Sequence, residues 1–229
     1  MRVRLSVYAS LPSTATLLRA AAAAGAPAGT AILALRQTAG RGTHGRSWAS
    51  PPGNLHLSVL LRPPLPLRAV PQIGLMAGVA LREAAGARTR LKWPNDLMLE
   101  GAKAGGILVE AEGDAAGGIA WVGLGFGVNL AHAPSLPDRP TAALGAEPPE
   151  DFAARLLSAL ARWQAVLVGQ GFAPIRSAWE EAGPPRGAPL SVARGASRIS
   201  GRYEGLSEEG GLRLATDAGS LTLHAGEVF

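Results

Sequence analysis

Residues 92–106 read KWPNDLMLEGAKAGG and contain Lys92 and Lys103, the only two lysines in the chain. Lysine and arginine together number 22, so arginine supplies the other 20 cations. The planar guanidinium forks across two oxygens and does not replace a compact ammonium that must lie against one. Two lysines in one short window therefore indicate a chemical role. The alternative is that Pro94-Asn95-Asp96 forms only a turn between two strands.

The same stretch predicts a β-hairpin. Residues 91–99 read as two short strands on either side of the Pro-Asn turn, and residues 103–110 read as a return strand. Between them, Glu100-Gly101 is typical of a hairpin tip. Such a hairpin brings Asp96 close to both lysines.

Strands and helices are expected on both sides of this hairpin. Alternating or apolar runs predict strands at 3–9, 30–37, 54–61 and 119–123, and helical periodicity predicts helices at 14–24, 68–85, 149–168 and 172–182. Ser13 is placed to cap the first of these helices. Strand 54–61 carries leucine and valine at every second residue, which predicts one buried face.

Gly183-Pro184-Pro185 predicts a boundary near the C-terminal end. Four short strands separated by glycine turns follow it, at 189–193, 199–203, 212–215 and 220–223. This spacing is typical of a small β-barrel. We therefore expect an α+β chain with one domain over residues 1–183 and a small barrel over residues 184–229.

The loop at residues 40–48 reads GRGTHGRSW. Its three glycines allow the backbone to approach a ligand, while Arg41 and Arg46 add two permanent cations, an arrangement typical of anion binding. Trp48 supplies a flat face for a ring. The sequence matches neither the Walker loop nor the dinucleotide fingerprint. The alternative is an exposed loop that is merely basic.

A second glycine run, GLGFGVNL at residues 123–130, contains Gly125, Gly127 and Asn129. These glycines permit another close approach of the backbone, and Asn129 offers an amide. A bulged core strand explains the same pattern equally well.

The composition fits a soluble globular protein, with 47% hydrophobic and 17% charged residues. The absence of cysteine excludes disulfides and thiolate metal sites, and the four histidines lack the spacing of zinc ligands. A net charge of +5 suits an anionic ligand, although the arginines are dispersed rather than clustered. No uncharged segment reaches membrane-spanning length. We expect a cytoplasmic protein without a membrane partner.

These motifs together resemble the biotin protein ligase family, which joins biotin to a lysine of a carrier protein. The resemblance covers nearly the whole chain, and the order of the motifs carries it. The matching segments are Ser13-Thr14, Gln37 to Gly42, Gly45 to Trp48, Lys92 to Asp96, Lys103 to Leu108, Gly125 to Asn129 and Gly226-Glu227-Val228.

The resemblance implies a class II synthetase-like fold: a central mixed or antiparallel sheet flanked by helices, followed by an SH3-like barrel. It also implies the reaction. The biotin carboxylate attacks the α-phosphate of ATP, with Mg²⁺ present, to give biotinyl-5′-AMP and pyrophosphate. A lysine of a biotin carboxyl carrier protein then takes the acyl group and releases AMP.

The resemblance further implies roles for individual residues. Lys103 would lie between the biotin carboxylate and the α-phosphate. Biotin would contact Ser13, Thr14, Gln37, Gly40, Arg41, Lys103, Gly106, Gly125 and Gly127. ATP would contact Arg41, Arg46, Trp48, Lys92, Asn95, Asp96 and Asn129. Catalysis would depend on Lys103, Arg41, Lys92 and Asp96, with Asp96 as the proton acceptor for the incoming lysine and Mg²⁺ near Asp96 and Asn129.

The chain departs from the family pattern at several positions. Thr43 stands where relatives usually carry a second arginine of the first loop, which puts tight retention of the adenylate in doubt. Ala15 stands where relatives usually carry asparagine. The first strand begins so early that we expect no N-terminal DNA-binding domain, no repressor function and no DNA partner. A monomer and a homodimer remain equally open.

Two alternatives remain at this stage. A lipoate ligase, or a lipoyl or octanoyl transferase, resembles the same fold and differs in the acid that it activates. A non-catalytic nucleic-acid-binding module belongs to a different class. Such a module would bind with steep salt dependence and turn over no ATP, and the aromatic content of 5% offers it no stacking platform.

Overall fold

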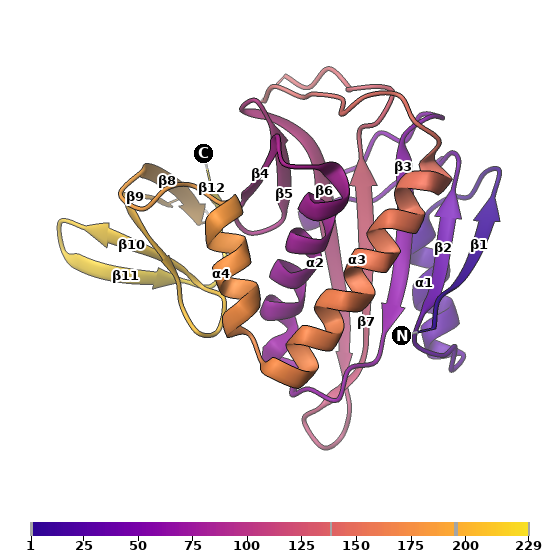
Figure 1. The fold of residues 1–229 in the computed structure, drawn as a ribbon, viewed down its shortest axis with the longest axis horizontal. Helices are drawn as coiled ribbons and strands as arrows, with labels where there is room; N and C mark the ends of the chain where they lie inside the picture. Colours follow the sequence, from indigo (N-terminus) through magenta and orange to yellow (C-terminus); the bar gives the residue numbers. More distant parts are fainter. Residues whose placement is uncertain (1, 138, 195–196, 229) are drawn as a thin grey trace.

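A seven-stranded mixed sheet forms the centre of the computed structural model, which describes residues 2–137, 139–194 and 197–228 (Figure 1). The strand order is β1-β2-β3-β7-β6-β5-β4, with β1 and β2 parallel and the other neighbours antiparallel. The strands are β1 Arg4–Tyr8, β2 Thr30–Ala34, β3 Leu55–Leu61, β4 Thr89–Lys92, β5 Asp96–Leu99, β6 Ala102–Gly113 and β7 Ile119–Val128. The predicted central sheet is confirmed.

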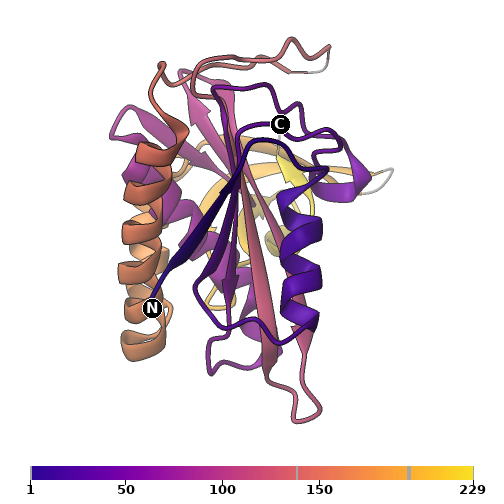
Figure 2. The same cartoon turned by 90° about the vertical axis from the view of Figure 1, so that its right-hand side faces the viewer.

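Helices cover both faces of this sheet (Figure 2). Helix α1 (Thr14–Ala23) lies on one face, and α2 (Val70–Ala85), α3 (Pro149–Gln170) and α4 (Ala173–Ala182) lie on the other. Short 3-10 turns occupy Thr43–Gly45 and Leu67–Ala69. Ser13 caps α1 as predicted, because its hydroxyl accepts a hydrogen bond from the Thr16 amide. None of the helices in the described ranges is long and apolar enough to cross a membrane.

The strand β3 is buried on both faces, whereas its alternating pattern predicted only one. Its leucine and valine side chains at odd-numbered positions join the larger core under α2 and α3. The residues between them, including Ser58 and Leu60, face α1 on the other side. A strand in the middle of a sheet covered on both faces has no solvent face, and this position overrides the sequence pattern.

The prediction that the strand beginning at residue 119 ends at Gly123 was wrong, because β7 continues to Val128. Residues 122–128 pair with β3 without a register shift, so the glycine run is not a bulge. Glycine weakens a strand by itself, but pairing with β3 on one side and β6 on the other holds the segment extended. The predicted strand 30–37 ends earlier, at Ala34.

The C-terminal segment forms a five-stranded antiparallel sheet, consistent with the predicted SH3-like barrel. Its order is β11-β10-β9-β8-β12, and its strands are β8 Pro189–Arg194, β9 Ser197–Leu206, β10 Leu212–Thr216, β11 Gly219–Leu223 and β12 Glu227–Val228. Buried residues such as Tyr203 belong to the same hydrophobic core as the central sheet. The Trp93 indole also donates a hydrogen bond to the Gly210 carbonyl at 3.2 Å. The second sheet is therefore packed firmly beside β4.

Candidate active site

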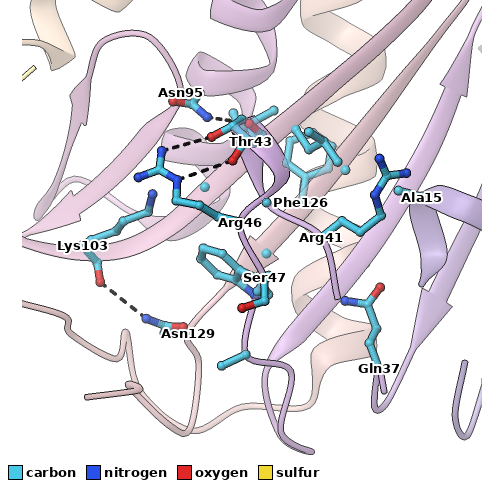
Figure 3. Close-up of a pocket in the computed structure, with 18 of the residues that line it drawn as sticks. Ala15, Gln37, Arg41, Thr43, Arg46, Ser47, Asn95, Lys103, Phe126 and Asn129 are labelled. Atoms are coloured by element: carbon cyan, nitrogen blue, oxygen red, sulfur yellow. Dashed lines mark hydrogen bonds between the residues drawn. The ribbon is translucent and has the colours of Figure 1, made fainter. Parts of the chain in front are cut away.

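A cavity of about 400 Å³ lies between the loop at residues 40–48 and the strands β6 and β7 (Figure 3). Most of the side chains predicted for the site line it, although they come from segments far apart in sequence. The predicted residues in its wall are Ser13, Thr14, Gln37, Arg41, Arg46, Trp48, Asn95, Lys103, Gly106, Gly125, Gly127 and Asn129. Gly40, Lys92 and Asp96 do not line the cavity but contact residues that do. Asp96 pairs with Lys103 and with Lys92, and the Gly40 carbonyl accepts a hydrogen bond from the Trp48 amide.

The floor of the cavity is a row of residues paired across five neighbouring strands. In register, Lys92 pairs with Asp96, Asp96 with Gly106, Gly106 with Gly127, and Gly127 with His56. Residues paired in this way point to the same face of a sheet. The two glycines therefore leave a flat strip without side chains between a carboxylate on one side and an imidazole on the other.

The indole of Trp48 lies on this flat strip. A methyl group added at Gly127 would lie 2.6 Å from the indole Nε1, and one added at Gly106 would lie 3.5 Å from the ring carbon Cζ3. The indole N–H is buried and has no hydrogen-bond partner within the described part of the chain. The close approach that the glycine run predicted is thus made by an aromatic ring from the first loop.

Lys103 and Asp96 form the closest ion pair of the site. Lys103 Nζ lies 2.5 Å from Asp96 Oδ1 and 5.7 Å from the centre of the Trp48 ring. Lys92 Nζ approaches the other oxygen of Asp96 at 3.9 Å. The hairpin prediction is confirmed, since one buried carboxylate holds both lysines. Lys103 is left between Asp96 and the cavity, where a second anion can reach it.

Burial lowers the pKa of the Lys92 ammonium. The positive charges of Lys103 and Arg139 act in the same direction, while Asp96 and Glu227 oppose the shift. Lys92 therefore loses its proton more readily than a surface lysine.

Hydroxyl and amide groups gather at the end of the cavity near α1. Ser58 Oγ donates to Thr14 Oγ1 at 2.8 Å, and Thr14 donates to the Gln37 side-chain oxygen through both its amide and its hydroxyl, at 2.8 and 3.1 Å. Ser13, Thr14 and Ser58 are all nearly fully buried. Buried hydrogen-bonding groups of this density suit the polar head of a ligand rather than an apolar one.

A carboxylate from the C-terminal sheet holds two arginines that line the cavity. Glu227 of β12 accepts hydrogen bonds from Arg46 Nη1 at 3.1 Å and from Arg139 Nη1 at 2.9 Å. Burial alone would raise the pKa of Glu227, but the hydrogen bonds and charges of the two arginines lower it below its usual range. Arg139 belongs to the loop after β7 and lines the cavity.

Arg41 is held by a different carboxylate. Its Nη1 lies 3.4 Å from Glu110 Oε1 on β6, and Arg19 of α1 approaches the same oxygen at 3.7 Å. Both arginine side chains are more than two-fifths exposed, so this contact contributes little to stability. An incoming anion can compete for Arg41 at low cost.

Two asparagines shape the wall near Lys103. Asn95 donates to the Ile107 carbonyl at 2.8 Å. Asn129 donates to the Ala142 carbonyl at 3.2 Å and to the Lys103 carbonyl at 3.4 Å, and Figure 3 shows the bond to Lys103. The Asn129 Oδ1 atom is buried and finds no partner among the described residues. It is an acceptor that a ligand, a water or a cation could use.

The described residues contain no group of three His, Cys, Asp or Glu side chains that could hold a metal ion. Mg²⁺ that arrives with a nucleotide needs only one or two protein oxygens, because phosphates and water supply the rest. The Asn129 oxygen fits that requirement. Asp96 is engaged by two lysines and fits it only if one of them moves.

Sequence reasoning missed several residues of the site. Arg139 lies in the proline-rich segment 131–150, for which no role was predicted, and Ser58 was interpreted as part of a core strand. Phe126 also lines the cavity, from within the glycine run. Glu227 stood in a recognised motif without an assigned role. Arg139 is the only lysine or arginine in the segment 131–150, and that is the one signal that could have identified it.

Comparisons with known proteins identify the family of this chain. Residues 7–127 match the model of the biotin/lipoate A/B protein ligase family. The chain is 40% identical over 217 residues to the biotin–[acetyl-CoA-carboxylase] ligase of Paracoccus denitrificans, covering 86% of this chain and 89% of that one. It is 33% identical to the bifunctional ligase/repressor BirA of Bacillus subtilis, of which it spans 66%.

Solved structures give the same result. The biotin protein ligase of Aquifex aeolicus in complex with biotin and ATP superposes with a TM-score of 0.80 at 26% identity, over 99% of this chain and 97% of that chain. The biotin protein ligase of Leishmania major in complex with biotinyl-5-AMP gives a TM-score of 0.68 at 26% identity, over 98% and 100% of the two chains.

The contact between Gly127 and Trp48 generates a first prediction. Gly127→Ala should displace the indole, because the added methyl carbon would lie closer to the ring atoms of Trp48 than van der Waals contact allows. The ¹⁹F NMR signal of 5-fluorotryptophan at position 48, assigned with Trp48→Phe, should therefore move or broaden. Gly125→Ala is the matched control, since its methyl group meets Leu108 at an ordinary 3.4 Å. Equal spectra for both alanine variants would contradict the packing.

Glu227 generates a second prediction, about pH. Its lowered pKa means that the folded state favours the carboxylate, so the stabilisation is complete above the usual value of 4.5 and is lost as the pH falls through the lowered value. The free energy of unfolding of the protein should exceed that of Glu227→Gln near pH 7, and the gap should close in acid. Urea titrations across this range measure it. Glu208→Gln, an exposed change, should show a smaller gap, and a gap for Glu227→Gln that stays constant into acid would refute the ion pairs.

Proposed function

Because the chain belongs to the biotin/lipoate A/B protein ligase family, we propose that it is an ATP-dependent biotin–protein ligase. It activates biotin as biotinyl-5′-AMP and transfers the biotinyl group to a lysine of a carrier protein. The observation that carries the proposal is the position of Lys103. Its ammonium lies in the cavity wall between the Asp96 carboxylate and the Trp48 indole.

The first step joins two anions, and the residues around the cavity suit that task. A carboxylate oxygen of biotin bonds to the α-phosphorus of ATP, and the bond from that phosphorus to the pyrophosphate oxygen breaks. Fixed cations stabilise the charge that spreads over the phosphoryl oxygens in the transition state. In our proposal Lys103 bridges carboxylate and α-phosphate, while Arg41 and Arg46 exchange their carboxylate partners for phosphate oxygens. Mg²⁺ bound to ATP neutralises further charge.

The second step forms an amide. The ε-amine of the acceptor lysine attacks the acyl carbon, the bond to AMP breaks, and a proton must leave the amine. Lysine is protonated at neutral pH, so the step requires a proton acceptor. Asp96 is our candidate, because it is the carboxylate nearest Lys103. Lys92, Asn95 and Asn129 are proposed to contact the nucleotide, and Trp48 to cover the adenine.

The polar end of the cavity favours biotin over lipoate or octanoate. The ureido ring of biotin carries two N–H donors and one carbonyl acceptor, which match the buried Ser13 and Thr14 and the half-buried Gln37. A dithiolane or an alkyl chain would gain no hydrogen bond from these groups, so this end of the cavity favours the acid that carries polar atoms there. Gly106, Gly125 and Gly127 are proposed to line the slot with backbone atoms, as their lack of side chains allows.

The nucleic-acid-binding alternative receives less support. Four of the arginines around the cavity, Arg19, Arg41, Arg46 and Arg139, share carboxylate partners, and they surround a cavity rather than a groove for a strand. We propose instead that residues 1–183 form the catalytic domain and that residues 184–229 hold the arginine loop through Glu227. A biotin carboxyl carrier protein as partner, a monomeric or homodimeric state and a cytoplasmic location complete the proposal.

Pyrophosphate release from Mg-ATP tests the function directly. Biotin, lipoate and octanoate are added singly to the purified protein, and an acceptor carrier domain is added afterwards. We expect release that depends on biotin, followed by transfer of the label to the carrier. Release that depends on lipoate would favour the related ligase, and salt-sensitive binding of nucleic acid without release would favour the binding module.

Lys103 provides the third prediction. Lys103→Ala should lower biotin-dependent pyrophosphate release by roughly 10²- to 10³-fold, the usual effect of removing one transition-state donor. Lys103→Arg should also be poor, because a guanidinium does not reproduce the point charge. Circular dichroism and thermal unfolding establish that the variants fold, and Arg162→Ala on α3 serves as an exposed control. A folded Lys103→Ala protein with near-normal release would disprove the assignment.

Thr43 provides the fourth prediction. Its hydroxyl accepts a weak hydrogen bond from Arg46 at 3.4 Å and adds no charge to the cavity. Thr43→Arg should hold the adenylate longer, by roughly tenfold in dissociation rate, since one hydrogen bond to a charged group contributes about 1.5–3 kcal/mol. The measurement is loss of labelled adenylate from the protein during gel filtration. Equal retention by both proteins would show that the missing arginine does not matter.

A further inference from the structure

A continuous chain of hydrogen bonds runs beneath the cavity and leads away from its polar end. Gln37 is the central link, because its side-chain oxygen accepts from Thr14 at the start of α1 while its side-chain nitrogen donates to Ser50 Oγ at 2.9 Å. Ser50 Oγ in turn donates to the Trp48 carbonyl at 3.1 Å. Ser50 does not line the cavity itself.

Every bond in this chain points in one direction. A serine hydroxyl has one proton, and Ser50 gives it to the Trp48 carbonyl while accepting from Gln37. At the other end, Ser58 donates to Thr14, and Thr14 donates to Gln37. Hydrogen bonds aligned in this way polarise one another. The lone pairs of Ser58 therefore remain available to a donor that enters the cavity.

The chain ends at the residue that covers the floor of the site. Trp48 is fixed on both sides of its α-carbon, since its amide donates to the Gly40 carbonyl at 2.9 Å and its own carbonyl accepts from Ser50. A side chain at Gly40 would obstruct this arrangement, because its β-carbon would lie 2.6 Å from Ser50 Oγ and 3.0 Å from the Gln37 nitrogen. The absence of a side chain at Gly40 thus makes room for the chain of hydrogen bonds.

We propose that Ser50 is a positioning residue that couples the acid-binding end of the cavity to the placement of Trp48. An N–H donor bound near Ser58 and Thr14 strengthens the aligned bonds, and Ser50 passes the effect to the Trp48 backbone. The indole is then held more firmly over the glycine strip. The inference rests on the proposed biotin ligase function, since it names the ligand that supplies the donors.

The experiment compares Ser50→Ala, which removes the hydroxyl, with Ser50→Thr, which keeps it. Ser158→Ala on α3 is the matched control for loss of a serine hydroxyl far from the cavity. All proteins carry 5-fluorotryptophan, and the ¹⁹F signal of Trp48 is recorded without ligand and during a titration with biotin. Steady-state pyrophosphate release gives KM for biotin and kcat for the same proteins.

We expect Ser50→Ala to shift or broaden the Trp48 signal before any ligand is added, and to weaken its response to biotin. KM for biotin should rise roughly fivefold, the usual effect of one lost hydrogen bond, with kcat changed less than KM. Ser50→Thr should restore both the signal and KM. A merely structural role would alter stability without this separation of KM from kcat and without rescue by threonine.

Two results would overturn the proposal, and they differ in meaning. If the wild-type protein binds biotin and Ser50→Ala matches it in both the Trp48 signal and KM, the coupling is wrong while the ligase function stands. If the wild-type protein shows neither binding of biotin nor biotin-dependent release, the function is wrong and the coupling falls with it.

Discussion

The site depends on one steric constraint: two adjacent strands must present bare backbone at the same level of the sheet. Gly106 and Gly127 face each other in register, and the Trp48 ring lies against both. Because the ring fills that strip, Lys103 stands at its edge between Asp96 and the indole. Any side chain on the strip would lift the ring and widen the space in which the ammonium must meet its ligands. The absence of side chains at Gly106 and Gly127 therefore determines where the Trp48 ring and the Lys103 ammonium lie.

Each cation around the cavity is already matched with a carboxylate from another element. Asp96 holds the lysines, Glu110 holds Arg41, and Glu227 holds Arg46. Without such partners the cations would repel one another across a narrow cavity. The carboxylates keep the cations in place and, at exposed contacts, release them at small cost. A polyanionic substrate thus exchanges one set of negative charges for another, and the net change in repulsion is small.

Local patterns predicted most of the fold, and the family resemblance supplied most of the residues that line the cavity. Long-range packing decided what both missed. Two glycines in β7 indicated a close approach, yet nothing near them in sequence identified Trp48 as the approaching group. The end of β7 was misjudged because pairing with both neighbouring strands outweighs the low strand propensity of glycine. The contacts of Arg139 with Glu227 require the second sheet to pack beside β4, and no periodicity in the sequence encodes that packing.

The pairing of both lysines with Asp96 also bears on how the protein withstands its own product. An acyl-adenylate that escapes from the cavity acylates nearby amines without selection, and a surface rich in lysine would become labelled. This chain offers only two side-chain amines, Lys92 and Lys103, and the same buried carboxylate binds both. Arginine, which supplies the other cations, stays protonated at neutral pH and offers no free lone pair to an acylating agent. The arginine-rich surface therefore offers the reactive intermediate few sites for acylation.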